Sequence, residues 1–471
     1  MTPRARALPV ALLAVLSTCA GGCGGGAGQN TPDAGSRTDQ GGPQPPTPTC
    51  AARSASLPDR PGATIRVSPL PDGEVQVGTE TRTLRQVVAS AAAGDTILLA
   101  DGVYTFPAAQ EGTYTGLYFT TPDVTLRGES GDPSAVVLDS AYGSHGDETA
   151  PITVAASGIV LADFTVQRSI FHLIHLWEAA DDVVVHRVTL VDGGQQFLKG
   201  SPGSGTNNRV EVSCSRFVMT AQGRDNVWGY GAQDGSTTCY TGGIDSHGGR
   251  DWHIHDSTFE GIYCDASGVA RPAHGQAASL RAGMTYTGGL SEHAIHMWDS
   301  ESGSSHVIER NRIVDCARGI GLGLQAEVFG GVIRNNMIAS RFPGSGEHDV
   351  GIIIERGHDT LVANNTVLLS APDSYDNAIE LRWASSSGLR VLNNLTNRRI
   401  QPRDGATATL GGNVEDITGD VFVDPSNGDL HLASCAAPSV IGAGQSVAEV
   451  SDDYDGDART TSLDVGADQC E

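Results

Sequence analysis

The segment "GGIDSHGGRDWHIHDSTFEG", residues 242–261, concentrates side chains that can transfer protons. It holds three histidines, three aspartates and one arginine, in a chain of 471 residues of which only 18% are charged. Histidine titrates near neutral pH, and a neighbouring carboxylate can orient its ring, so such pairs suit general acid–base catalysis. Which of these side chains act together depends on the elements that carry them.

A repeated strand pattern surrounds this segment. From residue 159 onward it returns eight times, at 161, 185, 212, 254, 308, 333, 362 and 391, with "LADFTV" as the first copy and "VLNNLT" as the last. The steps between copies are 24, 27, 42, 54, 25, 29 and 29 residues. A period in the twenties with short β-type segments indicates a solenoid.

The fourth position of each copy changes from apolar to polar along the chain. These positions are Phe164, Val188, Ser215, Ser257, Asn311, Asn336, Asn365 and Asn394. Asparagines in register on successive coils can bond one another and cap a tight turn, at a coil spacing of about 4.8 Å. A β-sandwich also has short strands, but it gives no reason for asparagine at these steps.

A second strand series lies upstream of the first, with copies at 172, 196, 242, 293, 318, 350 and 377. Because strand side chains alternate, we expect the third and fifth residues to face the core and the fourth and sixth to face outward. The fourth positions are His175, Lys199, Asp245, His296, Gly321, Ile353 and Glu380. The sixth positions are Trp177, Ser201, His247, Trp298, Gly323, Glu355 and Arg382.

This alignment predicts one polar patch, about 10 to 15 Å across, on adjacent coils. Its predicted catalytic residues are Lys199, Asp245, His247 and His296. Trp298 lies among them, and His175 and Trp177 flank them one coil away, as residues that would bind a substrate. His253 and His255 belong to a different strand and are expected to face solvent elsewhere.

Two long insertions, residues 222–241 and 265–293, fall on either side of the patch. Loops of this length in a regular solenoid are usually functional walls or lids. They carry Tyr230, Tyr240, Arg271, His274, Arg281, Tyr286, Glu292 and His293. Of the cations near the patch, Arg250, Arg271 and Arg281 are predicted to bind an anionic substrate, together with His293.

The asparagine pairs, short apolar strands and glycine turns resemble the right-handed parallel β-helix of pectate-lyase-like proteins, over residues 84–400. "LRQVVASAAAGDTILLADGVYTF", residues 84–106, reads as a helix, a strand and a turn. It resembles the N-terminal cap and first coil of extracellular polysaccharide lyases, including chondroitinase B-like enzymes. The predicted fold is all-β: a single-stranded right-handed parallel β-helix, or solenoid, with a short N-terminal helical cap.

"GGIDSHGG" is similar to the "YGIDPHD"-type motif of alginate C5-epimerases at Gly243, Ile244, Asp245 and His247, and departs from it at Ser246 and Gly248. The resemblance implies an acidic, uronate-containing polysaccharide as substrate. Its cleavage by β-elimination needs a base for the C5 proton, a positive group or calcium for the carboxylate, and a donor for the leaving oxygen. We expect lyase chemistry ahead of epimerase chemistry, with a noncatalytic glycan-binding lipoprotein as the other alternative.

Metal ions enter as two further hypotheses. Asp453, Asp455 and Asp457 alternate near the C-terminus and could hold calcium, but a solvated turn at the end of the β-helix is the favoured interpretation. His247, His296 and Asp245 offer nitrogen and oxygen ligands of the kind that zinc prefers. Hydrolysis by paired carboxylates is disfavoured, because among the outward positions only Asp245 is an acid near the centre of the patch.

The N-terminal residues predict export. Arg4 and Arg6 precede an apolar stretch and a small-residue cysteine site, as in a bacterial lipoprotein signal over residues 1–23 with lipid on Cys23, or alternatively on Cys19. Residues 24–55 form a Gly/Pro-rich linker, 56–404 the capped β-helix and 405–471 a C-terminal capping segment. The expected location is the outer membrane or cell surface, with a periplasmic or secreted protein as the alternative.

Charge and cysteine content limit the partners. A net charge of −25 argues against nucleic acid, which is bound through clustered Lys and Arg. Nine cysteines in an exported chain predict disulfides. Cys435 and Cys470 could close the C-terminal segment, whereas the partners of Cys214, Cys239, Cys264 and Cys316 stay open. We expect a monomer that contacts the membrane only through its lipid.

Overall fold

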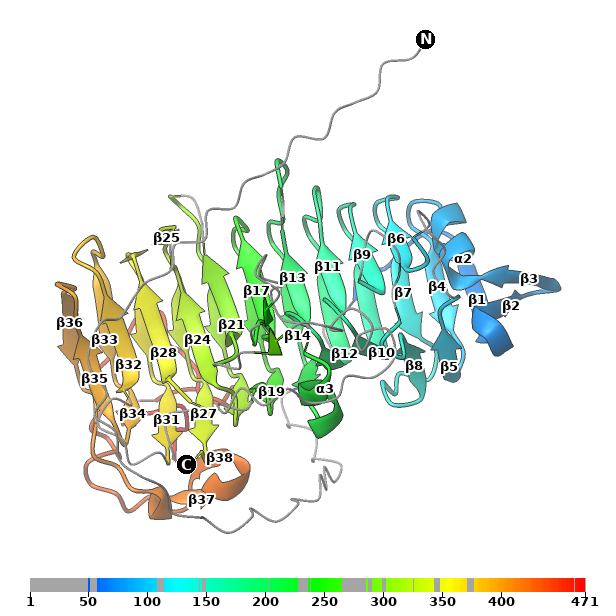
Figure 1. The fold of residues 1–471 in the computed structure, drawn as a ribbon. Helices are drawn as coiled ribbons and strands as arrows, with labels where there is room; N and C mark the ends of the chain where they lie inside the picture. Colours follow the sequence, from blue (N-terminus) through cyan, green and yellow to red (C-terminus); the bar gives the residue numbers. More distant parts are fainter. Residues whose placement is uncertain are drawn as a thin grey trace. The chain divides into compact units, whose positions relative to one another are not determined.

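Successive strands stack along one axis, each coil of the chain lying on the coil before it (Figure 1). The computed structural model describes residues 50, 57–107, 114–143, 145, 150–201, 203–227, 236–237, 239–264, 285–286, 290–298, 302–324, 326–342, 348–370, 377–460 and 462–470. The fold is all-β, a right-handed parallel β-helix with a minor helical cap, as the sequence predicted. Its coils carry three parallel ladders, one of which forms a separate sheet.

Ladder one consists of β1 (Thr64–Pro69), β4 (Thr96–Leu99), β7 (Thr125–Gly128), β10 (Val160–Ser169), β12 (Val184–Gly193), β14 (Glu211–Ser213), β18 (His253–His255), β22 (Val307–Glu309), β26 (Val332–Arg334), β30 (Leu361–Ala363), β33 (Leu389–Leu392) and β36 (Ala408–Gly411). Ladder two consists of β5 (Gly102–Thr105), β8 (Val136–Asp139), the second halves of β10 and β12, β15 (Arg216–Val218), β19 (Thr258–Glu260), β23 (Arg312–Val314), β27 (Met337–Ser340), β31 (Thr366–Leu369) and β34 (Leu395–Thr396). The two ladders are joined because β10 and β12 run through both.

The third ladder, called the site sheet below, has ten strands. They are β6 (Leu117–Phe119), β9 (Ile152–Val154), β11 (Ile174–Leu176), β13 (Leu198–Gly200), β17 (Ile244–His247), β21 (His293–Trp298), β24 (Arg318–Leu322), β28 (Val350–Glu355), β32 (Asn377–Arg382) and β35 (Arg399–Pro402). Figure 1 shows these strands side by side along the axis.

The N-terminal end of the β-helix has a strand and a hairpin before the predicted helix. β1 already pairs in parallel with β4, and β2 (Glu74–Val77) and β3 (Glu80–Thr83) form an antiparallel hairpin beside it. The predicted helix is α2 (Leu84–Ser90), which buries Leu84, Val87 and Val88. Its capping box explains where it begins, since the Thr83 hydroxyl accepts the Gln86 amide N–H and the Gln86 side chain accepts the Thr83 amide N–H.

The register of ladder one agrees with the sequence repeat at every copy. Leu161 pairs with Val185, Val185 with Val212, and so on through Ile254, Ile308, Ile333, Val362 and Val391. All these side chains are buried in one continuous core. The two long steps therefore leave the register intact, because the extra residues are inserted outside ladder one.

The asparagines form the predicted ladder of side-chain hydrogen bonds. The Nδ2 of Asn311 donates to Asn336 Oδ1 at 3.1 Å, and the same bond joins Asn336 to Asn365 at 2.9 Å and Asn365 to Asn394 at 3.0 Å. The sequence pattern missed the last rung, in which Asn394 donates to Asn413 at 3.0 Å. The ladder explains why polar residues are tolerated inside the coils.

The residue before each asparagine rung bends the backbone. Arg310, Asn335, Asn364 and Asn393 have φ between 52° and 55°, in the left-handed region. Asparagine adopts this conformation more readily than most residues, because its short side chain can bond locally. The "NN" pairs thus have a divided role: the first residue makes the turn and the second makes the rung.

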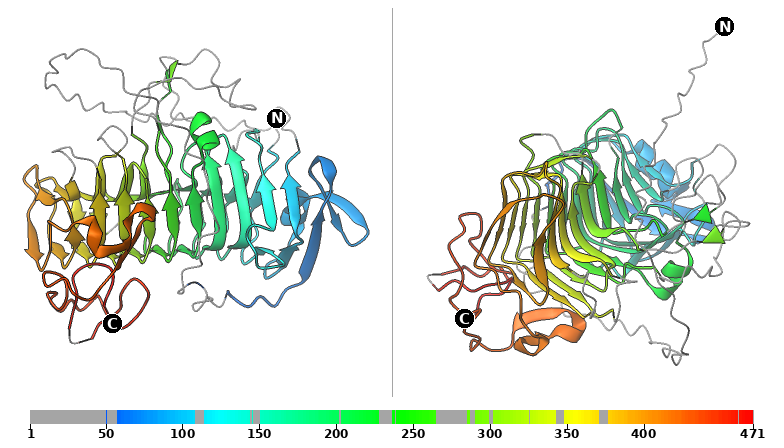
Figure 2. Two further views of the ribbon diagram at one scale, coloured as in Figure 1. Left: turned by 90° about the horizontal axis from the view of Figure 1, so that it is seen from below. Right: turned by 60° about the vertical axis from the view of Figure 1, so that its left-hand side comes forward.

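The C-terminal segment packs on the flank of the coils (Figure 2). It includes β37 (Phe422–Asp424), β38 (Asp429–Leu432) and the disulfide Cys435–Cys470. A buried ion pair fastens it, since Arg310 bonds Asp256 at 3.0 Å on the coils and Asp452 at 3.2 Å on the segment. The disulfide Cys435–Cys470 is the pairing that the sequence suggested for this segment.

The other disulfides resolve the pairings that stayed open. Cys50 bonds Cys214 across 164 residues, Cys239 bonds Cys264 across 25, and Cys316 is a buried free thiol. Three disulfides fit an extracellular or periplasmic location. Among the helices that the structure describes, none has the length and apolar character needed to cross a membrane.

Candidate functional site

The predicted outward column exists on the site sheet. His175 pairs with Lys199, Lys199 with Asp245, and Asp245 with His296, on the consecutive strands β11, β13, β17 and β21. The residues on either side of each, such as Ile244 and Ser246 beside Asp245, are turned inward and buried. Strand alternation therefore directs the four polar side chains away from the core, onto one surface.

Most of this column is nevertheless shielded from water. Lys199 is 6% exposed, Asp245 4% and His296 3%. His247, which belongs to the neighbouring outward column and pairs with Trp298, has a side chain that is 32% exposed. His247 can therefore reach a bound molecule, whereas Lys199, Asp245 and His296 lie beneath it.

Lys199, Asp245 and His247 form a closed triangle of contacts. The Nζ of Lys199 forms an ion pair with Asp245 Oδ2 and lies 2.8 Å from His247 Nε2. The same Nε2 lies 3.1 Å from Asp245 Oδ2. Lys199 can only donate a hydrogen bond, and the ionised Asp245 can only accept one. Nε2 of His247 must be unprotonated to accept from Lys199 and protonated to donate to Asp245, so the two neighbours favour different tautomers of the imidazole.

The charges in this triangle shift the titration of two members. Burial raises the pKa of the Asp245 carboxyl, but the Lys199 ammonium and then His247 outweigh it and hold that pKa well below its usual range. Burial lowers the pKa of His247, and the carboxylate of Asp245 opposes this only in part. At neutral pH the triangle therefore holds an ionised Asp245 beside a neutral, partly exposed imidazole.

Trp298 completes the exposed edge of the cluster. Its ring meets the His247 ring edge-on, with centroids 4.0 Å apart, and its indole N–H donates to Asp245 Oδ1 at 3.2 Å. The indole is partly exposed, and its polar atom is anchored by Asp245. A flat aromatic face held in this way suits the apolar face of a sugar ring.

His296 is held from both sides. Its Nε2–H donates to the backbone carbonyl of Gly323 at 3.0 Å, and its Nδ1 lies 3.5 Å from Asp245 Oδ1. The ring of His293 lies 4.5 Å from that of His296. His293, predicted to bind substrate, is in fact 6% exposed and sits beneath the surface beside His296.

A second aromatic group lies on the preceding coil. The His175 ring is 5.2 Å from the ring of Trp177 and 5.3 Å from that of His172. Burial, and then the Lys199 charge, lower the pKa of His175 to about 4, so this ring is neutral at physiological pH. His172 was not identified from the sequence, because an isolated histidine in the turn before a strand carries no signal of its neighbours.

The two long insertions are tied to each other beside the cluster. Cys239, near the end of the first insertion, bonds Cys264, which directly precedes the second. In addition, β16 (Ser236–Thr237) pairs in parallel with β20 (Thr285–Tyr286). The insertions are therefore joined twice, by a disulfide and by a short ladder.

Several predicted substrate-binding residues are not part of the described cluster. Arg271 and Arg281 lie outside the described residues, as do Tyr230 and His274. Arg250 lies in the turn after β17, where its amide N–H donates to Asn208 and its carbonyl accepts from Arg209. The cation that the triangle itself supplies is Lys199.

The other two histidines of the opening segment lie on ladder one, as predicted. His253 and His255 belong to β18, and their rings stack with centroids 4.0 Å apart. His253 contacts Glu309 at 3.0 Å, and His255 contacts Asp256 at 2.6 Å. Each of these two rings is therefore bonded to a carboxylate, and neither contacts His247.

The three C-terminal aspartates do not converge on one point. Asp453 is buried, and its carboxylate accepts the amide N–H groups of Asp455, Asp457 and Gln469. Asp455 instead contacts His431 at 3.0 Å. Within the described residues, the predicted calcium set is thus a turn organised around Asp453.

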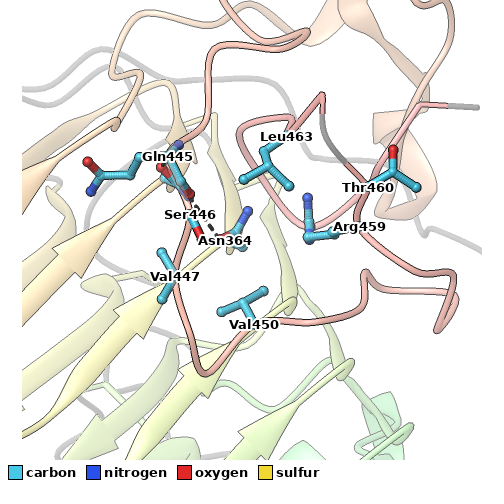
Figure 3. A pocket seen from close by; sticks show the side chains of 9 residues that line it. Asn364, Gln445, Ser446, Val447, Val450, Arg459, Thr460 and Leu463 are labelled. Carbon is cyan, nitrogen blue, oxygen red and sulfur yellow. Dashed lines mark hydrogen bonds between the residues drawn. The ribbon is translucent and has the colours of Figure 1, made fainter.

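A cavity of about 340 Å³ lies between the coils and the C-terminal segment (Figure 3). Its lining includes Asn364, Asn393, Gln445 and Arg459. These side chains mostly bond backbone groups across the seam: Asn364 bonds the carbonyls of Asp464 and Gly466, and Asn393 bonds that of Gln445. The cavity shares no residue with the site sheet and is a packing seam.

Comparisons with known proteins support the fold. No protein-family model and no curated protein matches the chain. The structure of the pectate lyase Pel9A is similar over 87% of this chain and 97% of its own, with 13% identity and a TM-score of 0.55. A rhamnogalacturonan lyase matches over 85% and 96%, with 12% identity and a TM-score of 0.36. A PL6 alginate lyase in complex with a trisaccharide matches over 71% and 82%, with 12% identity and a TM-score of 0.30.

Proposed function

We propose that this protein is an exported enzyme that cleaves a uronate-containing polysaccharide by β-elimination at the His247 surface of the site sheet. The observation that carries the proposal is the Asp245–His247 pair, with its buried lysine and its adjacent tryptophan face. The pectate lyase that shares the fold acts, by its name, on a uronate polymer, which supports this substrate class.

His247 is the proposed base. When its Nε2–H points to Asp245, the lone pair of Nδ1 is directed away from the triangle, and Nδ1 has no hydrogen-bond partner among the described residues. This tautomer gives up the hydrogen bond from Lys199 to Nε2, and Asp245 orients the ring and stabilises the imidazolium that forms as it takes a proton. Burial, and then the charge of Lys199, lower the pKa of His247 and keep the ring neutral beforehand, so that it can accept a proton at neutral pH.

The reaction follows from these roles. His247 Nδ1 removes the proton at C5 of a uronate, the C5–H electron pair forms the C4=C5 double bond, and the bond from C4 to the leaving oxygen breaks. The leaving oxygen takes a proton, which the imidazolium can supply when both positions lie on one face of the ring. The products are a chain end with a double bond and a shorter saccharide.

The aromatic residues give the surface a direction. Trp177 directly follows β11 and Trp298 ends β21. These strands are three strand spacings apart, or about 15 Å. A polysaccharide chain laid along the axis would contact both, with His247 close to Trp298. This arrangement suits a polymer better than a single sugar.

The remaining acids of the outward columns do not favour hydrolysis. Glu355 pairs with Arg382 at 2.8 Å, and Glu380 pairs with Arg403 at 2.8 Å. Both carboxylates lie two or more strands beyond His296 along the sheet. Of the described outward columns, the part from His175 to Trp298 holds Asp245 as its one acid, whereas glycosidases use a pair of carboxylates.

Export is proposed with lipid on Cys23, a tether from residue 24 to Cys50, where the disulfide to Cys214 joins the chain to the coils, and a monomer held at the outer membrane or cell surface. Calcium is retained only as a possible substrate-bound ion, since the C-terminal aspartates do not supply its ligands. Labelling cells with a fatty-acid probe tests the anchor: Cys23→Ser should abolish labelling and Cys19→Ser should not.

A substrate screen tests the reaction. The full chain is incubated with alginate, pectate and glycosaminoglycans, and the ultraviolet absorbance of the unsaturated uronate is followed, with proton exchange at C5 measured by NMR in deuterated water. Unsaturated product supports the lyase. Exchange without product would indicate the C5-epimerase alternative, and retention on a polysaccharide column without either would indicate a glycan-binding protein.

A further inference from the structure

Three metal-type ligands converge at the beginning of β21. One carboxylate oxygen of Glu292 and one ring nitrogen each of His293 and His296 lie within 4.8 Å of one another. Alternation alone would put His293 and His296 on opposite faces of a strand. Here Ala294 and Ile295 are both buried in the core, and this break in alternation brings the two rings to the same side.

His293 has unmet bonding capacity. It is 6% exposed, and among the described residues neither Nδ1 nor Nε2 has a hydrogen-bond partner. Buried polar side chains are nearly always bonded, so an imidazole with two unpaired nitrogens indicates a partner that is not a protein group. A carboxylate oxygen of Glu292 lies 4.0 Å from Nδ1, which is beyond a hydrogen bond. Ligand atoms of a tetrahedral zinc ion lie about 3.4 Å apart, so a small shift of these side chains would bring both onto one ion.

His296 is oriented as a metal ligand usually is. Its Nε2–H is committed to the Gly323 carbonyl, which leaves the lone pair of Nδ1 toward Asp245 Oδ1, 3.5 Å away. In the neutral ring, Nδ1 and Asp245 Oδ1 are then two hydrogen-bond acceptors that face each other. A cation bound at Nδ1 would remove their repulsion. A ligating histidine typically donates its other N–H to a carbonyl in this way.

Gly321 makes room for this cluster. A Cβ at that position would lie 2.7 Å from the Nε2 of His293. Gly321 occupies the outward column next to His296, where the sequence alone offered no reason for a glycine. The neighbouring cation, Arg318, is bonded to Asp349 at 2.9 Å, so its charge is already paired.

We propose that Glu292, His293 and His296 bind one divalent transition-metal ion, with Zn²⁺ the best match. Two imidazoles and one carboxylate are a zinc ligand set that leaves a fourth position open, whereas calcium prefers six or more oxygens. The ion would lie beside Asp245 and would supply a positive charge for the carboxylate of a uronate bound at His247. That role rests on the proposed function, but the binding itself does not.

The test is a titration of the untagged, metal-free full chain with Zn²⁺ by calorimetry, and with Co²⁺ by visible absorption, which reports tetrahedral coordination. We expect one ion per chain. His293→Gln and Glu292→Gln should weaken binding by about tenfold or more. The matched control is His348→Gln, which removes another buried histidine with two unpaired nitrogens, and it should bind as the wild type does.

His431→Gln is the second control, because His431, Asp455 and Asp468 also bring ligand atoms together. Absence of stoichiometric binding, or binding that persists in folded His293→Gln and Glu292→Gln, would overturn the proposal, as would loss of binding in His431→Gln alone. Circular dichroism confirms folding of each variant. Zinc binding without any unsaturated product supports this site and counts against the proposed reaction, so the two proposals fail separately.

Discussion

The Nε2 of His247 lies 2.8 Å from the Nζ of Lys199, although 48 residues separate them in the chain. The pairing of β13 with β17 creates this contact, since it puts Lys199 directly beside Asp245 and within reach of the histidine two residues later. A buried cation next to a partly exposed imidazole favours the neutral ring. A general base that acts at neutral pH needs that state.

Replacing Lys199 should therefore change the titration of His247. The groups that face its ring are Lys199 and His296, which lower its pKa, and Asp245, which raises it. In Lys199→Met the ammonium is lost, so the pKa of His247 should rise and the acid limb of the pH–rate profile should move to higher pH. NMR titration of the imidazole measures the first effect without a substrate, and an unchanged or lower pKa would contradict the account.

The loop disulfide should matter more for activity than for folding. Cys239 and Cys264 are buried in the core cluster but join the insertions outside ladder one, so the double variant Cys239→Ala/Cys264→Ala should lower the melting temperature and still keep the stacked coils. We expect turnover to fall by about tenfold or more, because the insertions position groups beside the site less well once the disulfide no longer joins them. The control is Cys435→Ser/Cys470→Ser, which should lower the melting temperature and leave turnover of the folded protein unchanged.

The asparagine ladder should be costly to break at its centre. Asn365 accepts two bonds from Asn336 and donates to Ile333, Ala363 and Asn394. Asn365→Ala leaves several buried groups unpaired, at about 1–3 kcal/mol each, so the free energy of unfolding should fall by about 3 kcal/mol or more. Asn413→Ala, at the partly exposed last rung, should cost about 1 kcal/mol in the same denaturant titration, and equal losses would argue against the ladder.

The C-terminal segment should loosen as the pH rises. Burial lowers the pKa of His431, but the carboxylates of Asp429 and Asp455 more than offset this and raise it to about 10. A raised histidine pKa stabilises the fold fully below the unfolded value near 6.5, and this contribution is lost as pH increases through the folded value. The gap in melting temperature between wild type and His431→Gln should shrink from pH 6.5 to 10, whereas a constant gap would refute the assignment.

The repeat made the fold and the column register predictable from the sequence. Apolar pairs such as Ile254 and Ile308 recur at positions that only stacked coils can use, and the alternation in "HAIHMW" then directs His296 outward. The burial of Lys199 could not be predicted, because shielding depends on what covers the sheet. Nor could the Cys50–Cys214 bond, which joins residues 164 apart. The orientation of the His293 ring toward His296 depends on a local break in strand alternation that the residue types do not predict.

The most direct measurement compares unsaturated-uronate formation by wild type, His247→Gln and His253→Gln on whichever uronate polymer the screen identifies. His247→Gln should lose activity by about 10² to 10⁴-fold with an unchanged melting temperature, as expected for loss of a general base. His253→Gln, on ladder one, should retain full activity. Full activity in folded His247→Gln, or equal loss in both variants, would contradict the claim that the Asp245–His247 pair is the catalytic centre.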